Sequence, residues 1–280
     1  MIDKVKFICR AYNILPQKNK GQNFLVSEKV LNEIVQAADL QPQDVVLEVG
    51  PGLGVLTEIL VKKAKKVLSV ELDKKLFSFL QDKFKSEKGL ALINQDILNW
   101  HPQDYIPGNY KIVANLPYNI SSSFLKKFLT AGHKPQSLVL LLQKEVAQRI
   151  CAKPGEMSLL SISVQLYAKP EIVNFVGKNN FWPKPEVDSA IIRISQVKNS
   201  QEMLAVFGEI SEKQFWQVVR IGFSARRKQL ANNLAAGLKI SNIEAKKALL
   251  KANLSELIRA QNLSVNDWIN LAKIVKNNLN

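Results

Sequence analysis

The segment Asn115-Leu116-Pro117-Tyr118, within NLPYNISS, combines groups that suit chemistry on an amine. The side-chain oxygen of Asn115 and the backbone carbonyl of Leu116 can each accept a hydrogen bond from an amine. Pro117 fixes the direction of the chain, and Tyr118 offers a flat face on which a planar ring can stack. Because the segment contains no acid, histidine, cysteine or lysine, we expect it to orient a nucleophile rather than to transfer a proton. The alternative is an ordinary turn with a packed aromatic side chain.

A glycine-rich loop, LEVGPGLGVLT (47–57), precedes this segment. It follows a predicted buried strand (44–50) and opens a predicted helix, a place where the backbone can pass close to a ligand. A dinucleotide fingerprint would place its third glycine at position 55, which is Val55, and the acid Glu48 lies two residues before Gly50. This spacing disfavours a nicotinamide dehydrogenase and favours a ligand that carries an amino acid and a nucleoside.

Two further acids end predicted strands. Glu71 lies in the predicted strand 66–72, where a carboxylate suits both hydroxyls of a ribose. Asp96 ends the predicted strand 90–96, where it suits the exocyclic amine of adenine. Taken separately, each residue has a purely structural alternative. Glu71 could be a solvated residue at the end of a strand, and Asp96 could be the N-cap of a helix at 97–100. The ordered set, at one crevice of a parallel sheet, indicates S-adenosylmethionine.

The elements that position these residues follow a regular alternation. Short β-rich runs alternate with amphipathic segments, which predicts an α/β domain of Rossmann-like type with a mainly parallel seven-stranded sheet. The predicted strands are 44–50, 66–72, 90–96, 110–116, 137–143, 160–168 and 189–195. The predicted helices of this domain are 56–65, 74–84, 121–131 and 143–152. From Ser200 the spacing of apolar residues is helical. We therefore expect two domains, a cofactor-binding catalytic domain (1–198) and a small all-helical domain (199–280).

The net charge of +15 and the pI of about 9.7 favour nucleic acid as the partner, the alternative being a charge that serves solubility alone. Cys9 and Cys151 are far apart in the sequence, and His101 and His133 are isolated. This composition argues against a disulfide scaffold and a metal site. Because no segment resembles a signal peptide or a membrane span, we expect a cytoplasmic protein.

Taken in order, these motifs resemble those of the ribosomal RNA adenine N6-dimethyltransferase family over nearly the whole chain. The motifs that carry the resemblance are GQNFL (21–25), LEVGPGLGVLT (47–57), VEL (70–72), NQDIL (94–98), NLPYNISS (115–122), LLQKEVAQRI (141–150), FWPKPEVDSA (181–190) and FSARRKQLANNL (223–234). The resemblance implies a cofactor site for S-adenosylmethionine formed by Asn23, Leu25, Gly50, Glu71, Asp96 and Asn115. The roles of Asn23 and Leu25 rest on the resemblance alone.

The resemblance implies N6,N6-dimethylation of two adjacent adenosines in the loop of the 3′-terminal hairpin of small-subunit (16S) ribosomal RNA. The partner would be this RNA or the 30S precursor, and we expect a monomer without metal or membrane attachment. One alternative is a macrolide-resistance methylase acting on large-subunit RNA, although those enzymes usually have Asn-Ile-Pro-Tyr. The other is a non-catalytic assembly factor that binds RNA on the same fold.

The family chemistry fits the corner at 115–118. Asn115 and Leu116 would accept the two N6 hydrogens of adenine, and the base would stack between Tyr118 and Phe181 after leaving its own stack. The usual fate of such aromatic side chains is core packing.

The predicted RNA-binding residues are Arg220, Arg226, Arg227 and Lys228. The alternative is that these side chains brace the two domains. Lysines and an arginine that flank the pocket and could extend this patch are Lys126, Lys127, Lys144 and Arg149. Departures from the family pattern at Lys20 and at Met157-Ser158-Leu159 concern RNA contacts.

Overall fold

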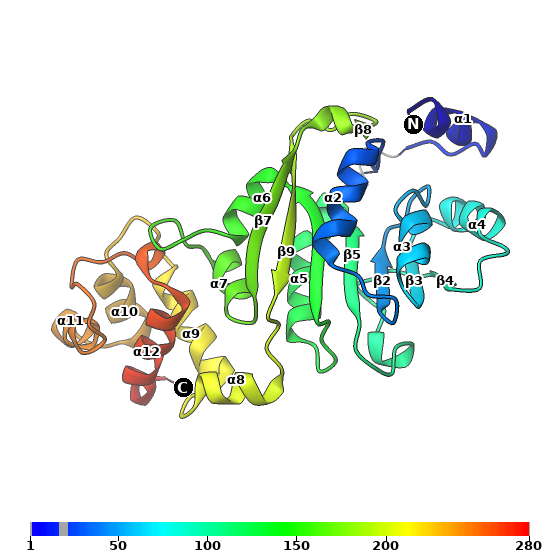
Figure 1. The fold of residues 1–280 in the computed structure, drawn as a ribbon. Coiled ribbons are helices and arrows are strands. Elements are labelled where there is room, and N and C mark those ends of the chain that lie inside the picture. The colour runs from blue at the N-terminus through cyan, green and yellow to red at the C-terminus, as the bar shows by residue number, and fades with distance from the viewer. Residues whose placement is uncertain (1, 17–21, 280) are drawn as a thin grey trace. The chain divides into compact units, whose positions relative to one another are not determined.

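The computed structural model describes residues 2–16 and 22–279, apart from the side chain of Tyr118 (Figure 1). The described chain contains a seven-stranded sheet of order β4-β3-β2-β5-β6-β9-β7. Its strands are β2 (Val45–Val49), β3 (Lys66–Glu71), β4 (Leu90–Asn94), β5 (Lys111–Asn115), β6 (Ser137–Gln143), β7 (Lys169–Val176) and β9 (Ser189–Ser195). Only β9 runs antiparallel to its neighbours β6 and β7. The predicted mainly parallel seven-stranded sheet is therefore confirmed.

Helices alternate with strands along the first part of the chain and make up the last part. The helices before residue 198 are α1 (Ile2–Ala11), α2 (Glu28–Ala38), α3 (Thr57–Lys63), α4 (Lys74–Lys83), α5 (Ser121–Thr130), α6 (Lys144–Ile150) and α7 (Leu159–Gln165). The later helices are α8 (Ser200–Phe207), α9 (Glu212–Gly222), α10 (Leu230–Leu238), α11 (Asn242–Lys251) and α12 (Val265–Ile274). A two-stranded antiparallel ribbon pairs β1 (Phe24–Leu25) with β8 (Phe181–Trp182).

The predicted strand 160–168 is wrong, because these residues form α7. Ser158 caps the helix, accepting a hydrogen bond from the backbone N–H of Ser161, whose hydroxyl in turn accepts one from the backbone of Ser158. This capping box selects a helix although Ile162, Val164 and Leu166 alternate as in a strand. The seventh strand is β7, an exposed edge strand that contains Pro170 and several polar residues and therefore has no apolar run.

The chain divides into two compact units, Met1–Gln148 with Ala168–Val197, and Arg149–Tyr167 with Lys198–Asn280. The predicted catalytic domain included 149–167, but the structure groups this segment with the helical unit. The reason is backbone pairing, since Gly155 and Met157 both donate to the carbonyl of Gln261, at 2.9 and 3.1 Å.

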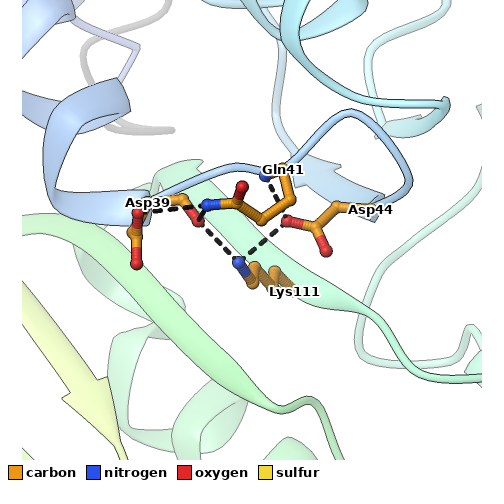
Figure 2. A network of polar contacts seen from close by, with 4 residues as sticks. All are labelled: Asp39, Gln41, Asp44 and Lys111. Carbon is orange, nitrogen blue, oxygen red and sulfur yellow. Dashed lines mark hydrogen bonds and ion pairs between the residues drawn. The ribbon is translucent and has the colours of Figure 1, made fainter.

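The amino ends of β2 and β5 are held together by a polar network (Figure 2). The ammonium of Lys111 lies 2.8 Å from a carboxylate oxygen of Asp44 and donates to the carbonyl of Asp39 at 2.7 Å. The same carboxylate accepts the backbone N–H of Gln41 at 2.8 Å. Asp39 ends α2 in the left-handed conformation, with φ of 46°. The network thus fixes the turn from α2 into β2 against the first residue of β5, at the end of the sheet away from the glycine-rich loop.

Two apolar clusters form the core around the glycine-rich loop. The first packs α2 and α3 against the central strands, through residues such as Leu31, Leu60 and Val113. The second joins α1, α4 and β1 through Val5, Leu80 and Phe24. Among the residues that the structure describes, no helix has both the length and the apolar composition of a membrane span, and no group of three or more metal-ligating side chains gathers.

Candidate active site

A pocket lies at the carboxyl ends of β2, β3 and β5. Its walls come from the segment 22–25, the glycine-rich loop with its preceding strand end, the end of β3 with the residues that follow it, and the segment 115–117, together with Leu31 of α2 and Leu76 of α4. This is the crevice at which open α/β sheets bind their ligands. The pocket brings together Asn23, Leu25, Gly50, Glu71 and Asn115, five of the six residues predicted to hold the cofactor.

The glycine-rich loop takes a conformation that other residues rarely adopt. Gly50, Gly52 and Gly54 all have positive φ, of 63°, 58° and 72°. A Cβ at Gly54 would also lie only 2.6 Å from the Phe84 ring. The loop therefore needs glycine both for its backbone and for its approach to α4.

Glu71 ties the end of β3 to this loop. Its carboxylate accepts the backbone N–H groups of Gly52, at 3.2 Å, and Asp73, at 2.9 Å. The side chain is 6% exposed, and its burial raises the pKa of the carboxyl group, while the two backbone donors oppose the rise. The carboxylate is thus fixed in direction at the pocket wall, where its remaining lone pairs can accept from a ligand.

Glu48 is a buried acid beneath the loop that the sequence analysis did not assign to the site. One of its oxygens accepts the hydroxyls of Thr57 and Ser69, at 2.7 and 2.6 Å. The other oxygen is buried and has no hydrogen-bond partner among the described residues, although Glu48 lines the pocket. Burial raises the pKa of this carboxyl group to about 7. The position of an acid two residues before Gly50 was the available signal.

The corner at 115–117 closes the pocket from β5. Asn115 ends the strand, and its amide nitrogen donates to the carbonyl of Asn23 at 3.3 Å. This bond leaves the role of acceptor to the amide oxygen. Leu116 is buried and donates its backbone N–H to Leu141 on β6 at 3.3 Å, so its position is fixed by the neighbouring strand. The predicted role of Tyr118 concerns a side chain outside the described residues.

Two predicted site residues lie outside the pocket wall that the described residues form. Asp96 follows β4 by two residues, and its carboxylate accepts the backbone N–H of Leu98 at 2.9 Å. Phe181 is 3% exposed and packs in the core, directly opposite the pocket residue Leu25 in the β1–β8 ribbon. Their roles toward adenine and the target base stay predictions.

The predicted RNA-binding residues are exposed on the helical unit. Arg220 lies in the last turn of α9, and the others occupy the turn between α9 and α10. Among the described residues none of these four side chains has a hydrogen bond or ion pair; they are Arg220, Arg226, Arg227 and Lys228. The buried amide of Asn233 donates to the carbonyls of Gly222 and Ala225, which holds this turn.

The residues that depart from the family pattern have structural roles where they are described. Met157 is buried and Ser158 caps α7, whereas Lys20 lies outside the described residues. Of the flanking lysines, Lys127 donates to the carbonyl of Leu98 and Lys144 lies 5.1 Å from the centre of the Phe175 ring. These two lysines are therefore engaged within the first unit.

The sheet and its pocket define a Rossmann-like α/β protein with a ligand site at the strand ends. The family model described as "Ribosomal RNA adenine dimethylase" matches residues 16–277. A "Ribosomal RNA small subunit methyltransferase A" of Dehalococcoides mccartyi is 44% identical over 270 residues, which cover 96% of this chain and 91% of the relative. One of Clostridium botulinum is 35% identical, over 96% of this chain and 98% of the relative. The chain belongs to the ribosomal RNA adenine dimethylase family and is an RNA adenine methyltransferase.

Solved structures agree with this membership. The crystal structure of a dimethyladenosine transferase from Plasmodium falciparum has a TM-score of 0.77 and 26% identity, with coverage of 91% of this chain and 98% of that chain. The 23S rRNA methyltransferase ErmE has a TM-score of 0.71 and 25% identity, with coverage of 91% of this chain and 100% of that chain. Both similarities extend well beyond the sheet, since they cover most of the helical unit as well.

Proposed function

We propose that this enzyme dimethylates N6 of two adjacent adenosines in the loop of the 3′-terminal hairpin of small-subunit (16S) ribosomal RNA. The observation that carries the proposal is that Asn115 lines the same pocket as two buried acids, Glu48 and Glu71. The relatives named for the small subunit, at 35–44% identity, support this substrate over the large-subunit RNA of the 25% identical structure. The enzyme acts in the cytoplasm, as a monomer, on the RNA or on the 30S precursor.

The pocket fits S-adenosylmethionine. The unpartnered oxygen of Glu48 is a buried acceptor that suits the ammonium group of the methionine part. Glu71 suits the ribose, and the glycine at position 50 lets the methionine part approach the backbone. Asn23 and Leu25 line the same pocket. Asp96, which lies outside this wall, would receive the adenine amine. When bound, the cofactor supplies a methyl group on a sulfonium, which needs no further activation.

The corner at 115–118 prepares the nucleophile. The amide oxygen of Asn115 and the carbonyl of Leu116 accept the two N6 hydrogens. The nitrogen lone pair is then no longer delocalised into the ring and can point toward the methyl group to be transferred. Tyr118 and Phe181 hold the plane of the base, for which Phe181 must turn out of its core position. Such orientation alone is worth up to about 7–11 kcal/mol. Because the methylated nitrogen loses its proton readily to water, the corner needs no base.

The helical unit supplies the contacts to RNA. The four exposed cations around the α9–α10 turn suit phosphate oxygens, and folded RNA is recognised largely through its backbone and shape. Since each phosphate contact releases counterions, RNA affinity should fall steeply with salt. Replacing both Arg226 and Arg227 by alanine should reduce that salt dependence and leave cofactor binding unchanged.

A labelling experiment tests the proposal. Labelled S-adenosylmethionine is incubated with the enzyme and either unmethylated small subunits or large-subunit RNA, and the labelled adenosines are mapped. Label in two adjacent adenosines of the small-subunit hairpin is expected. Label only in large-subunit RNA would identify the other methylase activity, and no label with intact RNA binding would identify an assembly factor.

A substitution in the corner tests the role of the amide. Asn115→Ala should abolish transfer while RNA binding stays within about twofold, because the lost acceptor orients the amine only in the reaction. Asn119→Ala is the matched control, since Asn119 is an exposed amide in the same motif. Full activity of Asn115→Ala would overturn the proposed role of the corner.

A further inference from the structure

The outer face of α1 carries a basic and aromatic stripe. Lys4, Phe7 and Arg10 are spaced three apart, so they lie along one side of the helix. All three are exposed, and the Phe7 side chain is 72% exposed. Six residues of helix span about 9 Å, which places one cation on each side of the ring. A large exposed aromatic side chain between two cations has no role in the core.

The inner face of α1 fixes this stripe beside the cofactor pocket. Val5 and Cys9 are buried in the same apolar cluster as Phe24, Leu53 and Leu76. These last three residues also line the pocket. The helix therefore packs on the outside of the pocket wall, and its opposite face is turned to solvent.

The charges of α1 specify the chemistry of a partner. The helix holds Lys4, Lys6 and Arg10 against a single acid, Asp3. Neither Lys4 nor Arg10 has a side-chain hydrogen bond or ion pair among the described residues. An apolar protein partner would have to bury both cations at a cost, whereas phosphates would neutralise them. An aromatic ring beside phosphate-binding cations is the arrangement that binds single-stranded nucleic acid, by stacking and by charge together.

We propose that the stripe Lys4-Phe7-Arg10 binds single-stranded RNA next to the target adenosine. One unpaired base stacks on Phe7, and the phosphates on either side pair with Lys4 and Arg10. The inference rests on the proposed function only in taking the substrate to be RNA. Helix α1 would then make a second RNA contact, separate from the cations of the helical unit. This contact would hold the strand from which the adenosine has been extruded.

Substitutions at Phe7 separate stacking from apolar contact. The probe is a fluorescein-labelled RNA of the unmethylated 3′-terminal hairpin with its flanking single strands, and anisotropy measures its affinity. Phe7→Leu keeps an apolar side chain but removes the ring, and we expect about 5- to 100-fold weaker binding. Phe7→Trp keeps a ring and should bind within about twofold of the unmodified protein. Lys4→Ala and Arg10→Ala should each lower the slope of log affinity against log salt by about one.

The matched control is Tyr105→Leu, which also removes an exposed ring, 44% exposed and outside the pocket wall. It should leave RNA affinity unchanged, and the cofactor affinity of every variant and the thermal melts of the Lys4, Phe7 and Arg10 variants should match those of the unmodified protein. Tyr105→Leu also removes a ring that stacks on the buried Trp100, so it should melt at a slightly lower temperature. Equal RNA affinity for Phe7→Leu and the unmodified protein would overturn the inference. So would a p-benzoylphenylalanine at position 7 that cross-links to ribosomal protein, instead of RNA, in small-subunit precursors.

The two proposals fail in different ways. If the unmodified enzyme places no methyl label on small-subunit RNA, the proposed function is wrong whatever Phe7 does. If it labels that RNA and Phe7→Leu neither weakens binding nor slows labelling at limiting RNA, only the role of α1 is wrong.

Discussion

The ammonium of Lys127, on α5, donates to the backbone carbonyl of Leu98 at 2.8 Å, two residues beyond Asp96. Burial lowers the pKa of Lys127, and the nearby charge of Asp96 opposes that shift. The backbone N–H of Leu98 in turn donates to the carboxylate of Asp96 at 2.9 Å. Through Lys127, helix α5 thus holds in place the segment after β4 that carries Asp96, the proposed acceptor for adenine.

Removal of this contact should loosen adenine binding. Lys127→Met keeps the length of the side chain but loses the donor, so we expect about 3- to 10-fold weaker binding of S-adenosylhomocysteine by calorimetry, the size of one lost hydrogen bond. Lys126→Met, at an exposed neighbour, should change nothing. For an analogue that lacks the 6-amino group, Lys127→Met should bind as the unmodified protein does. An equal loss for both ligands would mean that Lys127 does not act through Asp96.

Glu48 should make the stability of the ligand-free protein fall with pH. Its pKa rises from 4.5 to about 7 on folding, so the folded state holds an extra proton between these values. The stabilisation is complete below pH 4.5 and is lost as the pH rises through about 7. Glu48→Gln, which mimics the protonated acid, should therefore be more stable than the unmodified protein at pH 8.5, by up to roughly 3 kcal/mol.

Thermal melts at pH 5 and pH 8.5 check this sign. The two proteins should melt nearly together at pH 5 and apart at pH 8.5. Glu58→Gln, at a half-exposed acid paired with Lys83, is the control and should show no such gain at high pH. A gain from Glu48→Gln that is equal at both pH values would rule out titration of Glu48 as its cause.

The gathering of Gly50, Glu71 and Asn115 could be predicted from the sequence because parallel strands end at the same edge of a sheet. Their carboxyl ends carry these residues whatever the details of packing. The bond from Asn115 to Asn23, the unpartnered oxygen of Glu48 and the contact of Lys127 with Leu98 could not be predicted. The two contacts join segments that meet only in the folded chain, and the isolation of the Glu48 oxygen depends on what surrounds it there, so none leaves a pattern in the local sequence.

The errors of prediction have local causes. Residues 160–168 alternate like a strand, yet a serine cap turns them into α7. The edge strand β7 has one solvated face and a proline, so apolar runs do not reveal it. Helix α1 was not predicted, although Ile2, Val5 and Cys9 are spaced three and four residues apart, as in an amphipathic helix.

The network of Figure 2 should stabilise the first unit. Lys111 and Asp44 are only 15% and 14% exposed, so Lys111→Met would leave a poorly solvated carboxylate with one donor fewer. We expect the free energy of unfolding to fall by about 1–3 kcal/mol. Lys66→Met is the matched control, because Lys66 also begins a strand of the sheet but is exposed. Urea unfolding followed by circular dichroism measures both, and equal midpoints would contradict the expectation.

The helical unit should not tolerate a methyl group at Gly222. A Cβ there would lie 2.2 Å from the ring of Trp268, which is fully buried. Because neither α9 nor α12 can move without opening the core, Gly222→Ala should cost about 1–3 kcal/mol. Gly132→Ala, where a Cβ meets nothing within 4 Å, should be neutral. Differential scanning calorimetry would contradict the packing argument if the two variants melted alike.

The segment 149–167 has a consequence for how the protein is made. It leaves the ribosome before Gln261, the residue whose carbonyl pairs with Gly155 and Met157. At about 5–20 residues per second, the segment waits roughly 5–20 s for its partner during synthesis. Buried residues such as Met157 and Ile162 are unprotected in that interval. We therefore expect a gene cut at residue 198 to give two unstable halves, because the helical half would lack the segment 149–167 and the catalytic half would expose it.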